Sequence, residues 1–342
     1  MDEGLTLLVV GVVLSASIVL AIAARRTGLP VLVAFLVLGM LLGSDGPGGI
    51  AFNDAELARE VGTIGLVLIL YEGGLQTSWR RLRSVVVPAA LLSTVGVVVT
   101  AVLLGLAAQA LFDLTWLESV LLGAVVASTD AAAVFATLRF THIRRRLART
   151  LEAESGGNDP VAIALTLGLI AWIEHPDTYG LDDLTLLVVR QLGLGLAVGV
   201  VLGLAAMRIF ARIPESIGPF VPVASLAAAA VSFGAADTIG GSGFLAVYLV
   251  GLAVGSTPSR YRRQLVGFHE GVAFLAQVTL FVVLGLLVYP SQLPDVAVVV
   301  YDQYVGGWGL HGAYVSSGVG AQGRRFVPQC IQRPGRHRPQ HL

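Results

Sequence analysis

Long apolar stretches dominate the pattern of hydrophobic and polar positions along this chain. A helix needs about 20 mostly apolar residues to cross the hydrocarbon core of a bilayer. Ten stretches approach or exceed that length, at residues 5–24, 29–43, 61–78, 85–112, 115–138, 151–173, 184–208, 217–236, 238–257 and 268–289. Their apolar runs are continuous, unlike the alternating segments of about 10 residues that form membrane β-barrels. The pattern therefore predicts an all-α polytopic membrane protein of about ten transmembrane helices.

The first stretch is expected to stay in the protein as a helix. It begins with Met1-Asp2-Glu3 and has no basic segment before its apolar run, so it does not resemble a signal peptide. The eighth and ninth stretches are joined almost without a loop, which leaves the division between them open.

Composition supports a membrane protein and excludes several other classes. Charged residues make up 13% of the 342 residues, against about 25% in a soluble domain, and the mean hydropathy is +0.81. The single cysteine, Cys330, excludes a disulfide framework and a site of several thiolates. We find no cofactor motif and no basic helical patch of native origin, and we therefore expect neither redox chemistry nor nucleic-acid binding.

The loops predict the orientation, because cytoplasmic loops of membrane proteins collect basic residues. The loops after the odd-numbered stretches contain 15 arginines, whereas the opposite loops contain only Arg59 and Arg190. This asymmetry predicts a multi-pass membrane protein with its N-terminus outside the cell.

Acidic residues inside apolar helices are costly and usually functional. Seven acidic residues fall within the predicted helices: Glu72, Asp130, Glu152, Glu154, Asp159, Asp237 and Glu270. Four of the seven lie in the fifth and sixth stretches. The fifth stretch carries Ser128-Thr129-Asp130 near its middle. Because all three side chains compete with the helix for backbone hydrogen bonds, we expect the helix to unwind there and expose carbonyl oxygens. A polar packing patch between helices is the alternative.

The sixth stretch opens with a dense polar segment, Glu154-Ser155-Gly156-Gly157-Asn158-Asp159-Pro160. Glu154 and Asn158 lie four residues apart, as do Ser155 and Asp159, so their side chains form neighbouring ladders on one side of a helix. The two glycines allow another helix or an ion to approach the backbone. Carboxylate, amide, hydroxyl and carbonyl oxygens together suit a hard cation. The alternative, acids at a helix N-terminus, accounts for Glu154 but not for Asp159.

These two segments, on consecutive predicted helices, resemble the sodium/proton exchanger family of the monovalent cation:proton antiporter superfamily. Ser-Thr-Asp-Ala-Ala-Ala-Val-Phe and Glu-Ser-Gly-Gly-Asn-Asp-Pro look most similar to bacterial potassium/proton antiporters of the cell-volume-regulation type. The Asn158-Asp159 pair resembles the electroneutral branch of the superfamily. Leu70-Tyr71-Glu72-Gly73-Gly74-Leu75 also fits, and the resemblance covers roughly residues 5–295.

The resemblance implies a role for each candidate residue. Asp159 would bind either a proton or the cation, K⁺ or Na⁺, since a low dielectric disfavours an unpaired buried charge. Thr129 would offer its hydroxyl or carbonyl and Ser155 its hydroxyl, while Asp130 would support the unwound segment. Asn158 would hold the site together without a second titrating charge. Glu154 would pair with an arginine from a later helix.

The family also implies a fold of about 13 helices built from inverted repeats, and homodimers formed through helices outside the core. Residues 1–295 would supply about ten of these helices, without the second half of the ion-translocating core. Residues 296–342 look non-native and disordered: the last acidic residue is Asp302, and five arginines follow it. A frameshift or truncation explains this tail, and a natural short homologue is the alternative.

Other functions weigh less. An inactive, truncated membrane remnant of an antiporter is the main rival. An intramembrane aspartyl protease would pair Asp130 with Asp159, but this chain lacks the Gly-x-Gly-Asp motif that such enzymes usually carry. A channel would need a ring of like sites in an oligomer.

The remaining acids have weaker interpretations. Glu72 could line the ion path or pack between helices. Asp237 is expected to be solvated, and His269 and Glu270 to lie at the membrane interface.

Overall fold

The computed structural model describes residues 3–112, 114–129 and 145–292, and in them the chain is helical apart from turns and one isolated bridge between Gly43 and Ile50. The elements are α1 Glu3–Thr27, α2 Val31–Leu42, α3 Ala55–Gln76, α4 Trp79–Leu82, α5 Val86–Leu91, the π-helical turn η1 Leu92–Gly96, α6 Val97–Leu111, α7 Trp116–Val126, α9 Arg145–Glu174, α10 Leu181–Phe210, the 3₁₀ turn η2 Glu215–Phe220, α11 Val221–Thr238, α12 Gly243–Ser256, α13 Arg262–Leu286 and the 3₁₀ turn η3 Pro290–Gln292. The predicted tail, 296–342, lies outside the described residues.

Each of the ten predicted stretches contains a helix, although not all ten qualify as spans. Within the described residues, six are long and apolar enough to cross a membrane: Glu3–Ala24, Val86–Leu111, Arg146–Glu174, Leu181–Phe210, Ser216–Thr238 and Arg262–Leu286. Three more apolar helices are shorter, at Val31–Leu42, Trp116–Val126 and Gly243–Ser256. The eighth and ninth stretches are indeed separate helices, α11 and α12. The prediction of one helix over 115–138 is wrong in its length, because α7 ends at Val126.

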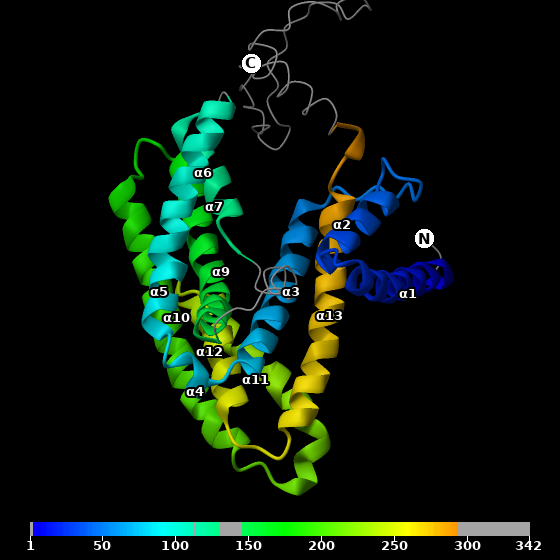
Figure 1. Ribbon diagram of the computed structural model, residues 1–342, viewed down its shortest axis with the longest axis vertical. Coiled ribbons are helices and arrows are strands. Elements are labelled where there is room, and N and C mark those ends of the chain that lie inside the picture. Colours follow the sequence, from blue (N-terminus) through cyan, green and yellow to red (C-terminus); the bar gives the residue numbers. More distant parts are fainter. Residues whose placement is uncertain (1–2, 113, 130–144, 293–342) are drawn as a thin grey trace, which may run out of the picture. The chain divides into compact units, whose positions relative to one another are not determined.

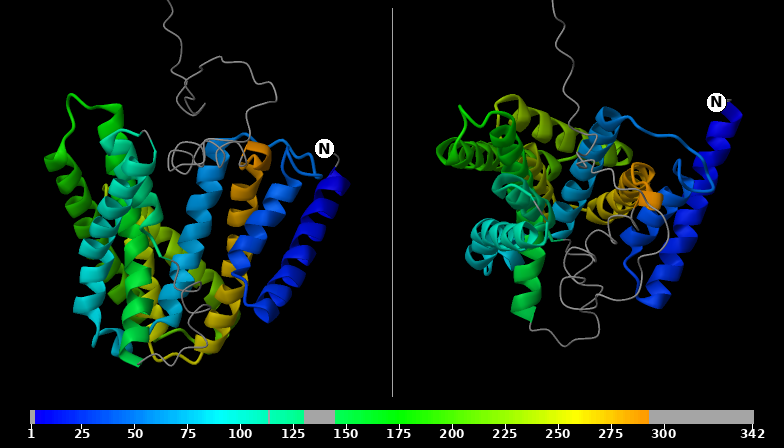
Figure 2. Two further views of the ribbon diagram at one scale, coloured as in Figure 1. Left: turned by 45° about the horizontal axis from the view of Figure 1, so that its top comes forward. Right: turned by 90° about the horizontal axis from the view of Figure 1, so that it is seen from above.

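The helices pack in two groups that meet along α9, α10 and α12 (Figure 1). In the first group, α6 and α7 pack together and α9 packs against α5, η1 and α7. In the second, α3 contacts both α12 and α13, and α11 packs against α12. Helix α2 packs on α13, and α1 lies along α2 beyond it (Figure 2). The two groups have separate apolar cores, the first around Ala124 and Leu165 and the second around Tyr71 and Val250.

Glycines bring helix backbones into direct contact, as is common where small residues line membrane helix interfaces. Between α3 and α12, a Cβ on Gly255 would lie 2.1 Å from the Leu75 carbonyl oxygen, and one on Gly251 would lie 2.5 Å from that of Tyr71. The Trp79 backbone N–H donates to Ser256 Oγ at 2.9 Å across the same contact. The close approach of α3 and α12 thus depends on positions without side chains.

A buried polar cluster links the helices of the second group. Ser225 of α11 bonds Tyr71 Oη of α3 at 2.9 Å and His269 Nε2 of α13 at 3.0 Å. The His269 ring also packs against Tyr71, with ring centroids 5.0 Å apart. The His269 side chain is thus buried between helices, with Ser225 and Tyr71 as its polar and aromatic contacts, and its place at the membrane interface stays a prediction.

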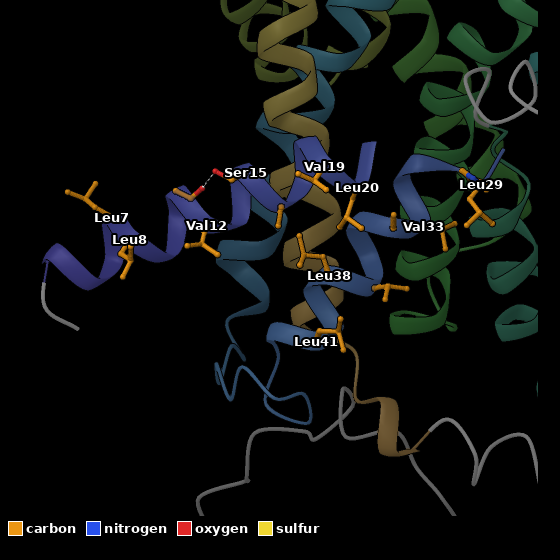
Figure 3. A pocket seen from close by; sticks show the side chains of 15 residues that line it. Leu7, Leu8, Val12, Ser15, Val19, Leu20, Leu29, Val33, Leu38 and Leu41 are labelled. Carbon is orange, nitrogen blue, oxygen red and sulfur yellow. Dashed lines mark hydrogen bonds between the residues drawn. The ribbon is translucent and has the colours of Figure 1, made fainter. Parts of the chain in front are cut away.

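An apolar groove of about 1070 Å³ runs between α1 and α2. Figure 3 shows leucine and valine side chains from both helices along it, including Leu8, Val12 and Leu38. Ser15, its one hydroxyl side chain, bonds the Gly11 carbonyl of its own helix at 2.8 Å.

Candidate functional site

The end of α7 opens toward α9. The helix begins with a capping box, in which the Thr115 hydroxyl and the Glu118 carboxylate bond each other's backbone N–H groups. Its last turn closes with the bond from Ala127 N to Gly123 O at 2.9 Å, after which Ser128 and Thr129 are not helical. The prediction that the helix unwinds at this polar segment is confirmed.

The opened segment presents a backbone carbonyl to α9. The Thr129 carbonyl oxygen accepts hydrogen bonds from Ser155 Oγ at 3.1 Å and from Asn158 Nδ2 at 3.2 Å. In a continuous helix this oxygen would accept from the N–H four residues further on. Here it lies among polar side chains of the neighbouring helix, and residue 133 is outside the described residues.

The Asn158 amide is the centre of this contact, and its side chain is fully buried. Besides the Thr129 carbonyl, Nδ2 donates to Thr129 Oγ1 at 2.7 Å and to Glu154 Oε1 at 3.2 Å. The Asn158 Oδ1 atom is buried as well and accepts no hydrogen bond from the part of the chain that the structure describes. The amide therefore fixes the opened segment on α9 without adding a charge.

Each of the two carboxylates is held by a hydroxyl from the opened segment. Ser128 Oγ donates to Asp159 Oδ1. Thr129 Oγ1 lies 3.2 Å from both oxygens of Glu154, to which it donates. Both acids are partly exposed, so their oxygens lie at the edge of the polar cluster and not in its interior.

Five of the six predicted site residues thus come together between α7 and α9: Thr129, Glu154, Ser155, Asn158 and Asp159. The sixth, Asp130, lies outside the described residues. Sequence reasoning passed over Ser128 as a site residue, although it stands in the same polar triplet and bonds the central carboxylate. Its position beside Thr129 was the available signal.

Two side chains from other helices lie against Gly156 and Gly157, in the turn of α9 from Glu154 to Asp159 that we call the site turn. A Cβ on Gly156 would lie 2.5 Å from Cε2 and Cζ of Tyr248, on α12. One on Gly157 would lie 2.8 Å from Ser93 Oγ, on the π-helical turn η1. The prediction that these glycines admit a neighbouring helix is confirmed. Neither Tyr248 nor Ser93 could be identified from the sequence, because neither lies near the site residues along the chain.

The other acids discussed above are placed elsewhere. Glu72 bonds Gln76 on α3, and Gln76 Nε2 also donates to Glu270 Oε1 of α13 at 3.3 Å. Asp237 is exposed at the end of α11, as expected for a solvated residue.

The site gathers oxygen atoms of several kinds within one small region. Two carboxylates, three hydroxyls and the Thr129 carbonyl come from residues 128–129 and 154–159. Oxygen donors of this kind are the ligands that hard cations prefer. The arrangement is therefore suited to a hard cation.

Comparison with known proteins agrees with this chemistry. The sequence profile of the transmembrane sodium/hydrogen exchanger family matches residues 13–301. The chain is 43% identical over 295 residues to the K(+)/H(+) antiporter NhaP of Alkalimonas amylolytica, a match that covers 85% of this chain and 51% of that protein. It is 38% identical over 291 residues to the K(+)/H(+) antiporter NhaP2 of Shewanella baltica, covering 84% of this chain and 50% of that one. The chain thus spans about half the length of the curated relatives it matches.

The fold also matches a solved structure. The sodium proton antiporter MjNhaP1 from Methanocaldococcus jannaschii superposes with a TM-score of 0.72 at 23% identity, over 88% of this chain and 75% of that chain. At this identity the match concerns the fold.

Proposed function

Because this chain belongs to the sodium/hydrogen exchanger family, we propose that residues 1–295 form the cation-binding part of a monovalent cation:proton antiporter. The observation that carries the proposal is the Thr129 carbonyl, which the end of α7 directs into the polar cluster of α9 beside Ser155. Asp159, held by Ser128 in the same cluster, is the carboxylate that binds either a proton or the cation.

The other residues of the cluster complete the site. Thr129 and Ser155 supply neutral oxygens, which lower the cost of removing water from a cation without adding charge. Asn158 joins the opened segment to α9 and stays neutral. Glu154 is held by Thr129 and Asn158 and pairs with an arginine from beyond the described residues. Asp130, which also lies outside them, supports the opened segment.

Exchange follows from competition for one carboxylate. An Asp159 carboxylate that has released its proton is negatively charged and binds one monovalent cation, whereas protonation removes the charge that holds the cation. Alternating exposure of the residue to the two sides of the membrane then exchanges one cation for one proton. With Asn158 neutral, the cycle moves no net charge.

The preferred cation of this proposal is K⁺. The relatives at 43% and 38% identity are named as K(+)/H(+) antiporters, whereas the archaeal relative of known structure, at 23% identity, is named for sodium. Na⁺ is the second candidate because both ions take oxygen ligands.

The extent of the active protein is a separate part of the proposal. We propose that residues 296–342 are a misread continuation, and that the complete gene encodes the second half of the core. The alternative is an inactive membrane remnant. Resequencing the gene through codon 300 and about 400 bases beyond it distinguishes the two. If the tail is misread, a single-base correction restores about three apolar helices; if the reading frame is confirmed as given, the remnant is the better description.

The arginine distribution places the N-terminus outside a bacterial plasma membrane in this proposal. At the N-terminus, we expect a fused alkaline phosphatase to be active and a fused green fluorescent protein to be dark. In the loop after α3, we expect an inactive phosphatase and a fluorescent green fluorescent protein. A homodimer through helices outside the core also belongs to the proposal, and cross-linking in native membranes tests it.

The function is tested by proton release from everted vesicles of an antiporter-deficient host, with a pH-sensitive dye. We expect K⁺ to dissipate the proton gradient, Asp159→Asn to abolish exchange, and Asp159→Glu to shift its pH profile. Asp237→Asn is the matched control, because Asp237 is exposed at the end of α11 and its loss should leave exchange unchanged. Full exchange by Asp159→Asn vesicles would end the assignment, and wild-type exchange by the 342-residue chain would end the remnant alternative.

A further inference from the structure

A buried hydroxyl from the helix before α6 contacts the backbone of the α9 turn that carries the candidate site. Ser93 lies in η1, a π-helical turn between α5 and α6, and its side chain is buried. Its Oγ atom lies 2.7 Å from the Ala89 carbonyl oxygen of its own helix and 3.2 Å from the Glu154 carbonyl oxygen of α9. The one hydroxyl proton is shared between the two carbonyl oxygens, with the shorter contact to Ala89, and in this way Ser93 links its own helix to the backbone of α9 at Glu154.

The glycine opposite makes this contact possible. A Cβ on Gly157 would lie 2.8 Å from Ser93 Oγ and 3.2 Å from Ser93 Cβ, which is closer than ordinary van der Waals contact. A π-helical turn also changes which residues face a neighbouring helix, and such turns are frequent at functional sites. Both features bring Ser93 against the backbone of α9.

The contact between Ser93 and α9 affects the site because Glu154 belongs both to this contact and to the polar cluster. Its carbonyl accepts from Ser93, and its carboxylate accepts from Thr129 and Asn158. We propose that Ser93 is a positioning residue for the cation site, and this inference rests on the function proposed above. The Ser93 hydroxyl fixes the rotation and height of the α9 turn relative to the opened end of α7. It thereby sets the spacing between the Thr129 carbonyl and the Asp159 carboxylate, and it does not touch the cation itself.

The first test is Ser93→Ala in the wild-type chain, with the downstream sequence that the resequenced gene encodes. A loss of one hydrogen bond that positions the ligands is expected to raise the apparent KM for K⁺ about three- to tenfold, with kcat within about twofold. Thr94→Ala is the matched control. Thr94 is half-buried, and its hydroxyl bonds the Ala90 carbonyl of the same helix at 2.7 Å in an exposed contact, so the variant should keep the wild-type KM.

A second test separates positioning from packing. Gly157→Ala forces a Cβ against Ser93 Oγ and should impair exchange strongly, whereas Ser93→Ala in the same chain removes the nearest atom. The double variant is therefore expected to be less impaired than the product of the two single effects, since residues in contact do not act additively. Gly193→Ala is the control substitution, because no atom of the described residues lies within 4 Å of a Cβ there.

The outcomes distinguish the inference from the function on which it rests. If wild-type vesicles exchange K⁺ while Ser93→Ala keeps the wild-type KM and pH profile, the positioning role is wrong and the antiporter assignment stands. If the double variant shows the full product of the single effects, Ser93 and Gly157 are not coupled and the role is also wrong. If no wild-type exchange is found with the complete chain, the proposed function fails and takes this inference with it.

Discussion

Two adjacent glycines of α3 allow a sharp test of how the helices of the second group are packed. Gly74 lies against α12: a Cβ there would be 2.4 Å from the Tyr248 carbonyl oxygen and 2.8 Å from the Leu252 nitrogen. At Gly73 a Cβ would meet no other atom within 4 Å in the described part of the chain. We predict that Gly74→Ala destabilises the protein strongly and that Gly73→Ala does not.

The magnitude follows from the distances. Ordinary contact begins at 3.4 Å, so α3 and α12 must separate by about 1 Å, the difference from the 2.4 Å found at Gly74. A gap of that size forfeits a quarter to a half of the dispersion energy of each contact across it, and overpacking typically costs about 1–3 kcal/mol. Because backbone atoms oppose the new methyl group on α12, we expect about 3 kcal/mol. Both variants gain about the same helix propensity, roughly 1 kcal/mol, so their difference isolates the packing term.

The assay is thermal unfolding of the two purified variants in the same detergent, followed by tryptophan fluorescence. About 3 kcal/mol corresponds to a midpoint roughly 5–10 °C lower for Gly74→Ala than for Gly73→Ala. Midpoints within 1 °C of each other would refute the reasoning, because α3 and α12 could then not be in backbone contact at Gly74.

Three further predictions test the polar contacts. Asn158→Ala removes the two amide N–H groups that the Thr129 carbonyl, the Thr129 hydroxyl and Glu154 share, and at about 1 kcal/mol for each N–H it should raise the apparent KM for K⁺ about 30-fold in the vesicle assay; a KM within twofold of wild type argues against the amide as the centre of the site. Ser225→Ala deprives Tyr71 and His269 of their shared partner, and at about 2 kcal/mol the unfolding midpoint should fall by roughly 4–8 °C; an unchanged midpoint would show that the cluster contributes nothing. Thr115→Ala removes the N-cap of α7 at a cost of about 1 kcal/mol, so hydrogen exchange in the first turn of α7 should quicken several-fold, and exchange at the wild-type rate would contradict the capping box.

The sequence predicts the parts of this fold that depend on local pattern. Continuous apolar runs are enough to locate the helices, because every backbone group in a bilayer must be satisfied within its own segment. The break after Val126 follows from Ser128 and Thr129, whose side chains compete with helical hydrogen bonds. The neighbouring ladders of Glu154 to Asp159 follow from helix periodicity alone.

Contacts between distant segments are not encoded in local pattern. The π-helical turn at Leu92–Gly96 contains an adjacent serine and threonine, as does the break after α7, yet here the chain stays helical, so this local pattern does not distinguish a π-helical turn from a break. His269 looks like an interface residue in isolation, and only the approach of α3 and α11 makes it a buried one. The place of Ser93 and Tyr248 against the site glycines likewise depends on tertiary packing.

The separations of these contacts along the chain also determine the order in which they form during synthesis. The bond from Asn158 to Thr129 joins residues 29 apart, whereas the bond from Trp79 to Ser256 joins residues 177 apart. At about 5–20 residues per second, the ribosome completes the first pair within about 1–6 s of making Thr129. Ser256, the last residue of α12, is made about 9–35 s after Trp79, which begins α4 directly after α3. The polar cluster between α7 and α9 can therefore form early in the nascent chain, whereas the contact between α3 and α12, which holds the second group of helices together, can form only after α12 has been made.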